Sequence, residues 1–197
     1  FWGAPQQDPR HALHAITAAM TIKQRIKELN ADFAKREWPE INVGIGINTG
    51  KMNVGNKGSE FRVDYTVLGD AVNLASRLEK LTKFYGVDVI VGENTHQAVP
   101  EFAFRQLDRV KVKGKDKPVM VYEPLKPIET MEESEKVSLH RFHHGVEFFR
   151  EGKWDEAERE ITPLSQLEPQ RQIYRIYLER IRHHRRHPPP EDWDGSY

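Results

Sequence analysis

The sequence predicts an α+β fold followed by a short all-α segment. Apolar residues recur at helical spacing over His11–Arg36 and again over Asp70–Tyr85. Alternating β-branched residues mark strands at Ile41–Thr49 and Phe61–Val67, and from Val137 the pattern is helical throughout. The order helix, hairpin, helix, strand, hairpin is typical of a sandwich in which helices cover one face of a sheet.

The first elements follow from local signals. Trp38-Pro39 ends the first helix, because the residue before a proline disfavours helical backbone. Residues 50–58 are rich in glycine and turn residues, with a short apolar stretch at Met52–Val54, and together with Phe61–Val67 they predict a β-hairpin. Asp70 is expected to be the N-cap of the next helix, and Gly86 its end.

The following elements are shorter. Val87–Val91 predicts a buried strand and Glu93–Ala98 a brief helix. Phe102–Val112 and Pro118–Tyr122 predict two strands, joined by the lysine-rich turn Lys113–Lys117.

The composition changes after residue 125. We expect residues 1–125 to form one domain, 126–136 a charged linker, 137–187 a helical segment and 188–197 a proline-rich tail. Within the helical segment, the spacing resembles a single tetratricopeptide repeat of about 34 residues, although Arg141 and Leu164 depart from the pattern. The residues that carry the spacing are Gly145, Phe148, Ala157, Ile161 and Pro169. A third helix at Gln170–His184 would cover the pair, and one repeat must pack on the rest of the chain or on a partner.

Composition excludes several classes of function. The 197 residues contain 30 Lys and Arg, 30 Asp and Glu and no Cys. The net charge of zero favours neither nucleic acid nor a membrane surface, and disulfides and thiolate metal sites are excluded. No apolar run reaches the roughly 20 residues that span a bilayer. The opening FWGAPQQDP has no initiator Met and no leader, so we expect a cytoplasmic piece of a longer chain.

One pair of polar residues is placed for chemistry. Asn73 and Arg77 are four residues apart on a predicted helix, so they share one face near its N-terminus. An amide and a guanidinium there can hold a polyphosphate and a sugar oxygen. The alternative is an ordinary solvated helix face, since this spacing is common.

The surrounding residues extend this interpretation. Tyr65–Glu79 (YTVLGDAVNLASRLE) resembles the signature of class III adenylate and guanylate cyclases. Gly44–Arg62 resembles the glycine-punctuated hairpin of that family, FWGAP a strand end of its bacterial members, and Val112–Lys115 its phosphate-binding turn. The resemblance covers residues 1–125 and implies the C-terminal, partial form of a ferredoxin-like cyclase sandwich.

The resemblance implies roles for four residues. Asn73 would orient the ribose, and Arg77 would stabilise charge on the α-phosphate while the 3′-hydroxyl attacks. Lys115 would contact the terminal phosphates. Thr66 would read the purine edge and favours ATP, because a hydroxyl can accept from the exocyclic amine of adenine. Alternatively, Thr66 is an ordinary strand residue without a binding role, and Lys115 is a solvated lysine in a turn.

The resemblance also implies a cofactor and a partner. Family cyclases bind Mg²⁺ or Mn²⁺ through two aspartates on strands that precede FWGAP, so the ligands are expected upstream of Phe1 and the chain alone is expected to be inactive. We interpret neither Asp64 nor Asp70 as a ligand. The active form would be a homodimer that turns ATP into cyclic AMP and pyrophosphate, with a membrane contact only through an upstream segment.

The sequence is also compatible with other functions. A non-catalytic cyclase-fold module that dimerises or regulates is one alternative, and a guanylate cyclase is another. The histidines at 140, 143 and 144 and those at 183, 184 and 187 lack acidic partners, so we expect solvated surface and no metal. Arg180–His187 reads as a basic helix end, without the aromatic platform that nucleic-acid binding needs.

Overall fold

The structure is a computed structural model that describes residues 1–59, 62–111, 117–190 and 192–196. It contains two compact units, Phe1–Pro100 and Glu101–Tyr197, which we describe separately as unit 1 and unit 2. The mixed helices and strands are those of an α+β fold, as the sequence predicts. The elements of unit 1 are α1 (His11–Lys35), β1 (Ile45–Ile47), β2 (Asn53–Ser59), β3 (Arg62–Leu68), α2 (Asp70–Tyr85), β4 (Val89–Gly92) and α3 (Glu93–Gln97).

The core of unit 1 forms where α2 packs on two parallel strands. β1 pairs with β4, and Ile45 lies opposite Val89. Leu78 of α2 and Ile90 of β4 are fully buried. A Cβ at Gly46 of β1 would collide with the carbonyl oxygen of Ala75, so a glycine is needed for this strand to approach the helix.

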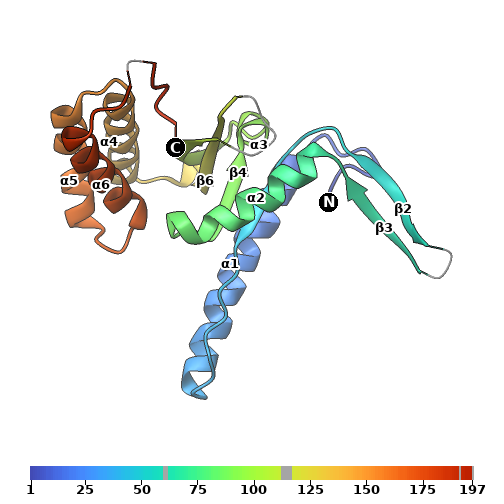
Figure 1. Ribbon diagram of the computed structural model, residues 1–197. Coiled ribbons are helices and arrows are strands. Elements are labelled where there is room, and N and C mark those ends of the chain that lie inside the picture. The colour runs from blue at the N-terminus through green and yellow to red at the C-terminus, as the bar shows by residue number, and fades with distance from the viewer. Residues whose placement is uncertain (60–61, 112–116, 191, 197) are drawn as a thin grey trace. The chain divides into compact units, whose positions relative to one another are not determined.

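Only the first half of α1 is buried. Ala12, Ile16 and Ala19 are covered, whereas Ile22 and Leu29 farther along are exposed. The helix runs as one continuous element well past the strand segments of its own unit (Figure 1). Its length agrees with the predicted helix at His11–Arg36.

The β-hairpin predicted in unit 1 is present, but its first strand lies elsewhere than expected. Most of the turn-rich residues 50–58 form β2, which pairs antiparallel with β3 and places Val54 opposite Val67. The ribbon extends away from α2 (Figure 1). The segment predicted as a strand at Ile41–Thr49 is a strand only at β1. The glycines of residues 50–58 have the composition of a turn, although a strand can contain glycine at a cost in stability.

The start of α2 also corrects a prediction. Asp70 is the first helical residue, and Gly69, with φ at 144°, is the N-cap. No side chain caps this helix. The positive φ explains why glycine precedes the helix, and Asp70 contributes a negative charge to its first turn.

Unit 2 combines a β-hairpin with three helices. Its elements are β5 (Phe102–Val110), β6 (Val119–Pro127), the 3₁₀ turn η1 (Ile128–Thr130), α4 (Glu133–Arg150), α5 (Trp154–Leu167) and α6 (Gln172–Arg186). Residues 126–136, expected to be a linker, instead contain the end of β6, η1 and the start of α4. Reciprocal hydrogen bonds between Glu132 and Glu135 begin α4 as a capping box.

The three helices share one core. A Cβ at Gly145 of α4 would lie 2.8 Å from Cγ1 of Ile161, so these helices approach closely. The ring of Tyr177 in α6 lies 5.8 Å from that of Phe142 and 5.1 Å from that of Phe149. The predicted third helix is therefore present as α6, and the tetratricopeptide character of the pair stays a prediction.

A bulge in β5 is where these helices meet the hairpin. Gln106 pairs with Tyr122 and Asp108 with Val121, so Leu107 has no partner in β6. The hydroxyl of Tyr177 donates a 2.9 Å hydrogen bond to the carbonyl oxygen of Leu107. Leu107 is opposite no residue of β6, so this bond supplies its buried carbonyl oxygen with a hydrogen-bond partner.

Buried ion pairs surround the bulge. Arg180 of α6 contacts Asp108 at 2.7 Å, and these side chains are 8% and 1% exposed. Arg105 contacts Glu123 across the hairpin at 2.7 Å, and Arg171 reaches the other oxygen of Glu123 at 3.6 Å. Arg180, the first residue of the predicted basic helix end, therefore has its charge neutralised inside the unit.

Candidate active site

The helix α2 presents two different faces. Val72 and Ala75 point toward β1 and line a cavity, whereas Asn73 and Arg77 lie on another side of the helix. Asn73 is exposed and Arg77 is half-buried. The structure therefore brings the predicted amide and guanidinium together on one face, one turn apart.

Thr66 lies on β3, in the strand that leads into α2. It is half-buried and directly opposite Gly55 of β2. Because side chains alternate along a strand, Thr66 and Leu68 share one face of the ribbon, whereas Val54 and Val67 on the other face line the cavity. Thr66 thus faces away from the cavity.

Lys115, the predicted contact for the terminal phosphates, lies outside the described residues. The described chain reaches Lys111 at the end of β5 and resumes at Lys117 before β6. Both of these lysines are exposed. The role of Lys115 stays a prediction from the sequence.

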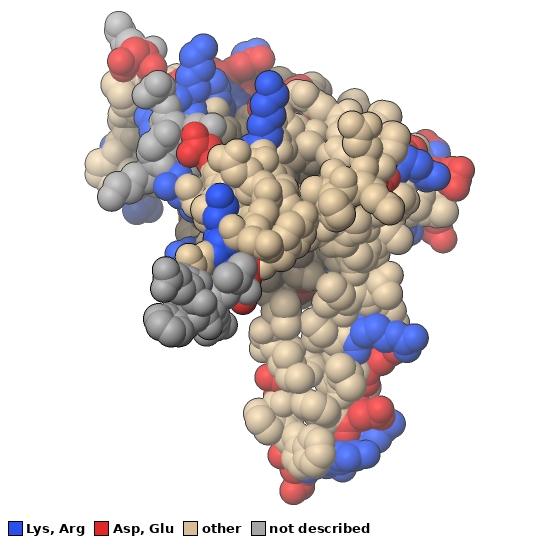
Figure 2. All heavy atoms as spheres, turned by 90° about the vertical axis from the view of Figure 1, so that its right-hand side faces the viewer, with Lys and Arg blue, Asp and Glu red and all other residues tan. Residues whose placement is uncertain are grey.

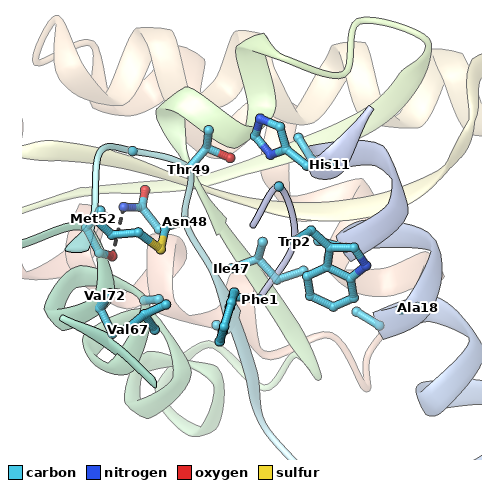
Figure 3. A pocket seen from close by; sticks show the side chains of 18 of the residues that line it. Phe1, Trp2, His11, Ala18, Ile47, Asn48, Thr49, Met52, Val67 and Val72 are labelled. Atoms are coloured by element: carbon cyan, nitrogen blue, oxygen red, sulfur yellow. Dashed lines mark hydrogen bonds between the residues drawn. The ribbon is translucent and has the colours of Figure 1, made fainter. Parts of the chain in front are cut away.

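A cavity of about 570 Å³ lies between α1, β1 and α2 (Figure 3). Its walls are mostly apolar, with Val67 and Val72 at one side and Trp2 near Ala18 at another. None of the described residues that line it is Lys or Arg. A polyphosphate would find no cationic side chain there, so the cavity is not suited to the phosphates of a nucleotide.

The polar groups of the cavity already serve the fold. Asn48 donates a 3.0 Å hydrogen bond to the carbonyl oxygen of Ala71, which ties β1 to the first turn of α2 (Figure 3). The hydroxyls of Thr49 and Thr95 are 2.9 Å apart. No sequence pattern indicates this cavity, because its lining comes from several separate segments of the chain.

Two histidines of unit 2, His143 and His184, are less solvated than expected. His143 accepts a 3.0 Å hydrogen bond from the backbone N–H of Gln106. His184 is 8% exposed, stacks on Trp154 with centroids 5.2 Å apart, and burial lowers the pKa of its imidazole. Both rings therefore contact the interior of unit 2, which corrects the expectation of a solvated surface at these two positions.

The face of the molecule in Figure 2 carries charges of both signs. Figure 2 shows Lys and Arg beside Asp and Glu over the visible face, with no extended patch of one sign. This agrees with the equal totals of 30 basic and 30 acidic residues. In the described part of the chain, no helix has the length and apolar character that crossing a membrane requires.

Comparison with known proteins decides the family. A model of the "Adenylate and Guanylate cyclase catalytic domain" matches residues 1–123. The chain belongs to this family. The matched region contains Asn73, Arg77 and Thr66, together with Lys115.

Individual cyclases agree with this assignment. Adenylate cyclase 1 of Rhizobium meliloti is 38% identical over 124 residues, which are 62% of this chain and 19% of that protein. The chain thus spans about a fifth of the length of this curated relative. Among solved structures, the adenylyl cyclase CyaB from P. aeruginosa aligns with a TM-score of 0.58 and 26% identity over 66% of this chain and 68% of that one. The guanylyl cyclase Cya2 aligns with a TM-score of 0.59 and 29% identity over 66% of each chain.

The described residues do not supply the metal ligands that are expected of a cyclase. Among the residues that the structure describes, no group of three or more His, Cys, Asp or Glu side chains is placed to hold an ion. Asp64 and Asp70 are both exposed, at opposite ends of the segment that leads into α2. The described residues therefore do not fit the two-ion centre, and the chemistry below is derived without it.

Proposed function

We propose that this chain supplies the phosphate- and sugar-binding half of an adenylate cyclase site, which converts ATP to cyclic AMP and pyrophosphate. The observation that carries the proposal is the pairing of Asn73 and Arg77 on the outward side of α2, within a chain of the cyclase family. Because neither side chain points into the core side of the helix, both can meet a nucleotide at the surface.

The reaction explains why a guanidinium is needed. The 3′-oxygen forms a bond to the α-phosphorus, the bond to the pyrophosphate oxygen breaks, and the hydroxyl proton passes to solvent. Negative charge shifts onto the transferring group and the leaving oxygen in the transition state. A fixed Arg77 stabilises that charge more than it stabilises the ground state, and Asn73 orients the ribose that carries the attacking hydroxyl.

Thr66 and Lys115 would bind the two ends of the same substrate. The Thr66 hydroxyl can accept a hydrogen bond from the exocyclic amine of adenine, and Lys115 would neutralise the terminal phosphates. Guanylyl cyclases are as similar in structure as adenylyl cyclases, so the choice of ATP depends on Thr66. A divalent ion and a homodimer complete the proposal, as they do in the family resemblance.

Replacing Arg77→Ala in the intact protein tests the proposal. We expect kcat for ATP to fall about 10²- to 10³-fold, because one transition-state contact is lost, while ATP binding remains measurable. Lys80→Ala is the matched control, since it removes the same charge from an exposed position one turn along α2. Unchanged turnover in the Arg77 variant would contradict the assignment.

Two further outcomes address the alternatives. An intact wild-type protein that dimerises without turning over ATP or GTP would favour a non-catalytic cyclase-fold module. A preference for GTP in the same assay would favour a guanylate cyclase and would remove Thr66 as an adenine reader.

A further inference from the structure

Gly55 differs from the other glycines in the described part of the chain. Each of the others either has a φ between 65° and 146° or would bring a Cβ within 3.0 Å of a neighbouring atom. Gly55 has neither feature, since nothing lies within 4 Å of a Cβ built there. The fold of unit 1 therefore does not explain a glycine at this position.

A glycine inside a strand has a cost. It packs no side chain and loses more backbone entropy on folding than any other residue, so β-branched residues are preferred. Gly55 lies in the middle of β2, between Val54 and Asn56. Where the fold gives no reason for an interior glycine, close approach of a ligand or of another backbone is the remaining physical reason.

The neighbours of Gly55 indicate which ligand would approach. Thr66 lies directly opposite, and a side chain at position 55 would stand about 5 Å from that of Thr66 on the same face of the ribbon. Leu68 is on this face too and is 51% exposed, opposite Asn53. A hydroxyl, a flat stretch of backbone and an exposed apolar side chain thus adjoin one another.

These features match the needs of a purine ring. A flat aromatic base binds against apolar surface with a polar group that reads its exocyclic substituent, and a strand position without a Cβ lets the ring approach the backbone closely. We propose that Gly55 is a specificity-determining residue, whose missing side chain leaves the space in which the adenine ring lies against β2 beside Thr66. This inference rests on the proposed function and adds a residue to its base-binding part.

Gly55→Val in the intact protein tests this inference. Nothing within 4 Å of the added Cβ obstructs it, and Val suits a strand, so the variant is expected to fold. We expect KM for ATP to rise about tenfold or more with kcat within about threefold, and Gly55→Ala to give a smaller rise, because bulk is added where the base binds. Calorimetric titration with ATP should show the same loss of affinity.

Lys57→Val is the matched control. Lys57 is exposed on the same strand and the same face of the ribbon, two residues farther from Leu68, and we expect its KM to stay within about twofold of wild type. An unchanged KM in Gly55→Val would overturn the inference. So would loss of dimer in sedimentation that accounts for the whole change, because a second chain would then be what approaches Gly55.

Failure of the proposed function would look different. Wild-type protein that binds ATP without turning it over would contradict cyclase activity, and the calorimetric comparison would still decide whether Gly55 adjoins the base. Wild-type protein that binds no ATP would overturn both.

Discussion

The two compact units fix a helix on a strand by different physical means. In unit 1, β1 approaches α2 through glycine, and a Cβ at Gly46 would strike the helix backbone. In unit 2, side chains bridge the gap: Arg180 of α6 neutralises Asp108 of β5, and Tyr177 donates to the carbonyl oxygen of Leu107. One contact depends on the absence of atoms and the other on buried charge.

This difference bears on where chemistry can occur. Backbone contact needs no polar side chain, so Asn73 and Arg77 of α2 lie on the side of the helix away from β1. In unit 2, Arg105, Arg180 and their acidic partners form buried ion pairs within the unit. Under the proposed function, unit 1 binds the substrate, and substitutions can test the two kinds of contact separately.

The largest expected effect is the loss of a buried charge partner. Arg180→Leu leaves Asp108, which is 1% exposed, without its cation. We expect the free energy of unfolding to fall by about 3–5 kcal/mol, with faster amide exchange in β5. Denaturant unfolding and hydrogen exchange measure the two effects.

The control for this change is Arg182→Leu. Arg182 is exposed and donates a hydrogen bond along its own helix, to the carbonyl oxygen of Leu178. Equal destabilisation by the two variants would show that the buried pair is not what holds α6 to the hairpin.

An intermediate loss of stability is expected when the glycine at the contact between β1 and α2 is replaced. Gly46→Ala adds a Cβ against the backbone of Ala75 and Glu79, which cannot move without shifting α2. We expect the free energy of unfolding to fall by about 1–3 kcal/mol, since overpacking forces a backbone displacement. Gly55→Ala makes the same chemical change in a strand with open space, and should not destabilise the protein. If both variants were equally stable, the close approach of β1 to α2 would not need its glycine.

The smallest effect concerns pH. Burial lowers the pKa of His184 below its ordinary 6.5, so the unfolded chain binds a proton more readily than the folded one. Unit 2 should hold its full stability above pH 6.5 and lose some of it as the pH falls from there toward the folded pKa. His184→Phe should flatten this dependence, measured by amide exchange of α6 between about pH 7.5 and pH 5. An unaltered pH profile in the variant would assign the dependence to another group.

The sequence predicted well what depends on local pattern. The helical period gave α1 and α2 nearly to the residue, and the spacing of Asn73 and Arg77 predicted their common face. Residues 50–58 have the composition of a turn, so the sequence does not indicate that most of them form β2. Acids are common at an N-cap, so the sequence predicts Asp70 there, whereas the backbone at Gly69 adopts a φ that favours glycine.

Local sequence patterns do not predict contacts between residues that are distant in the chain. Nothing in a helical pattern reveals that Arg180 finds Asp108, or that His143 accepts a hydrogen bond from the backbone of β5. The same holds for the cavity beside α2, whose walls come from separate elements. The open space around Gly55 is likewise visible only in the folded ribbon, because its sequence position does not distinguish it from the other glycines.

Glu123 carries a consequence for how such chains are recombined. It is the last residue matched by the cyclase family, and its carboxylate joins Arg105 of the hairpin to Arg171 at the start of α6. A gene fusion that exchanged everything after this residue would keep the carboxylate and discard one of its two cations. A fusion joined after residue 123 is therefore expected to need a new cation near Glu123 in place of Arg171.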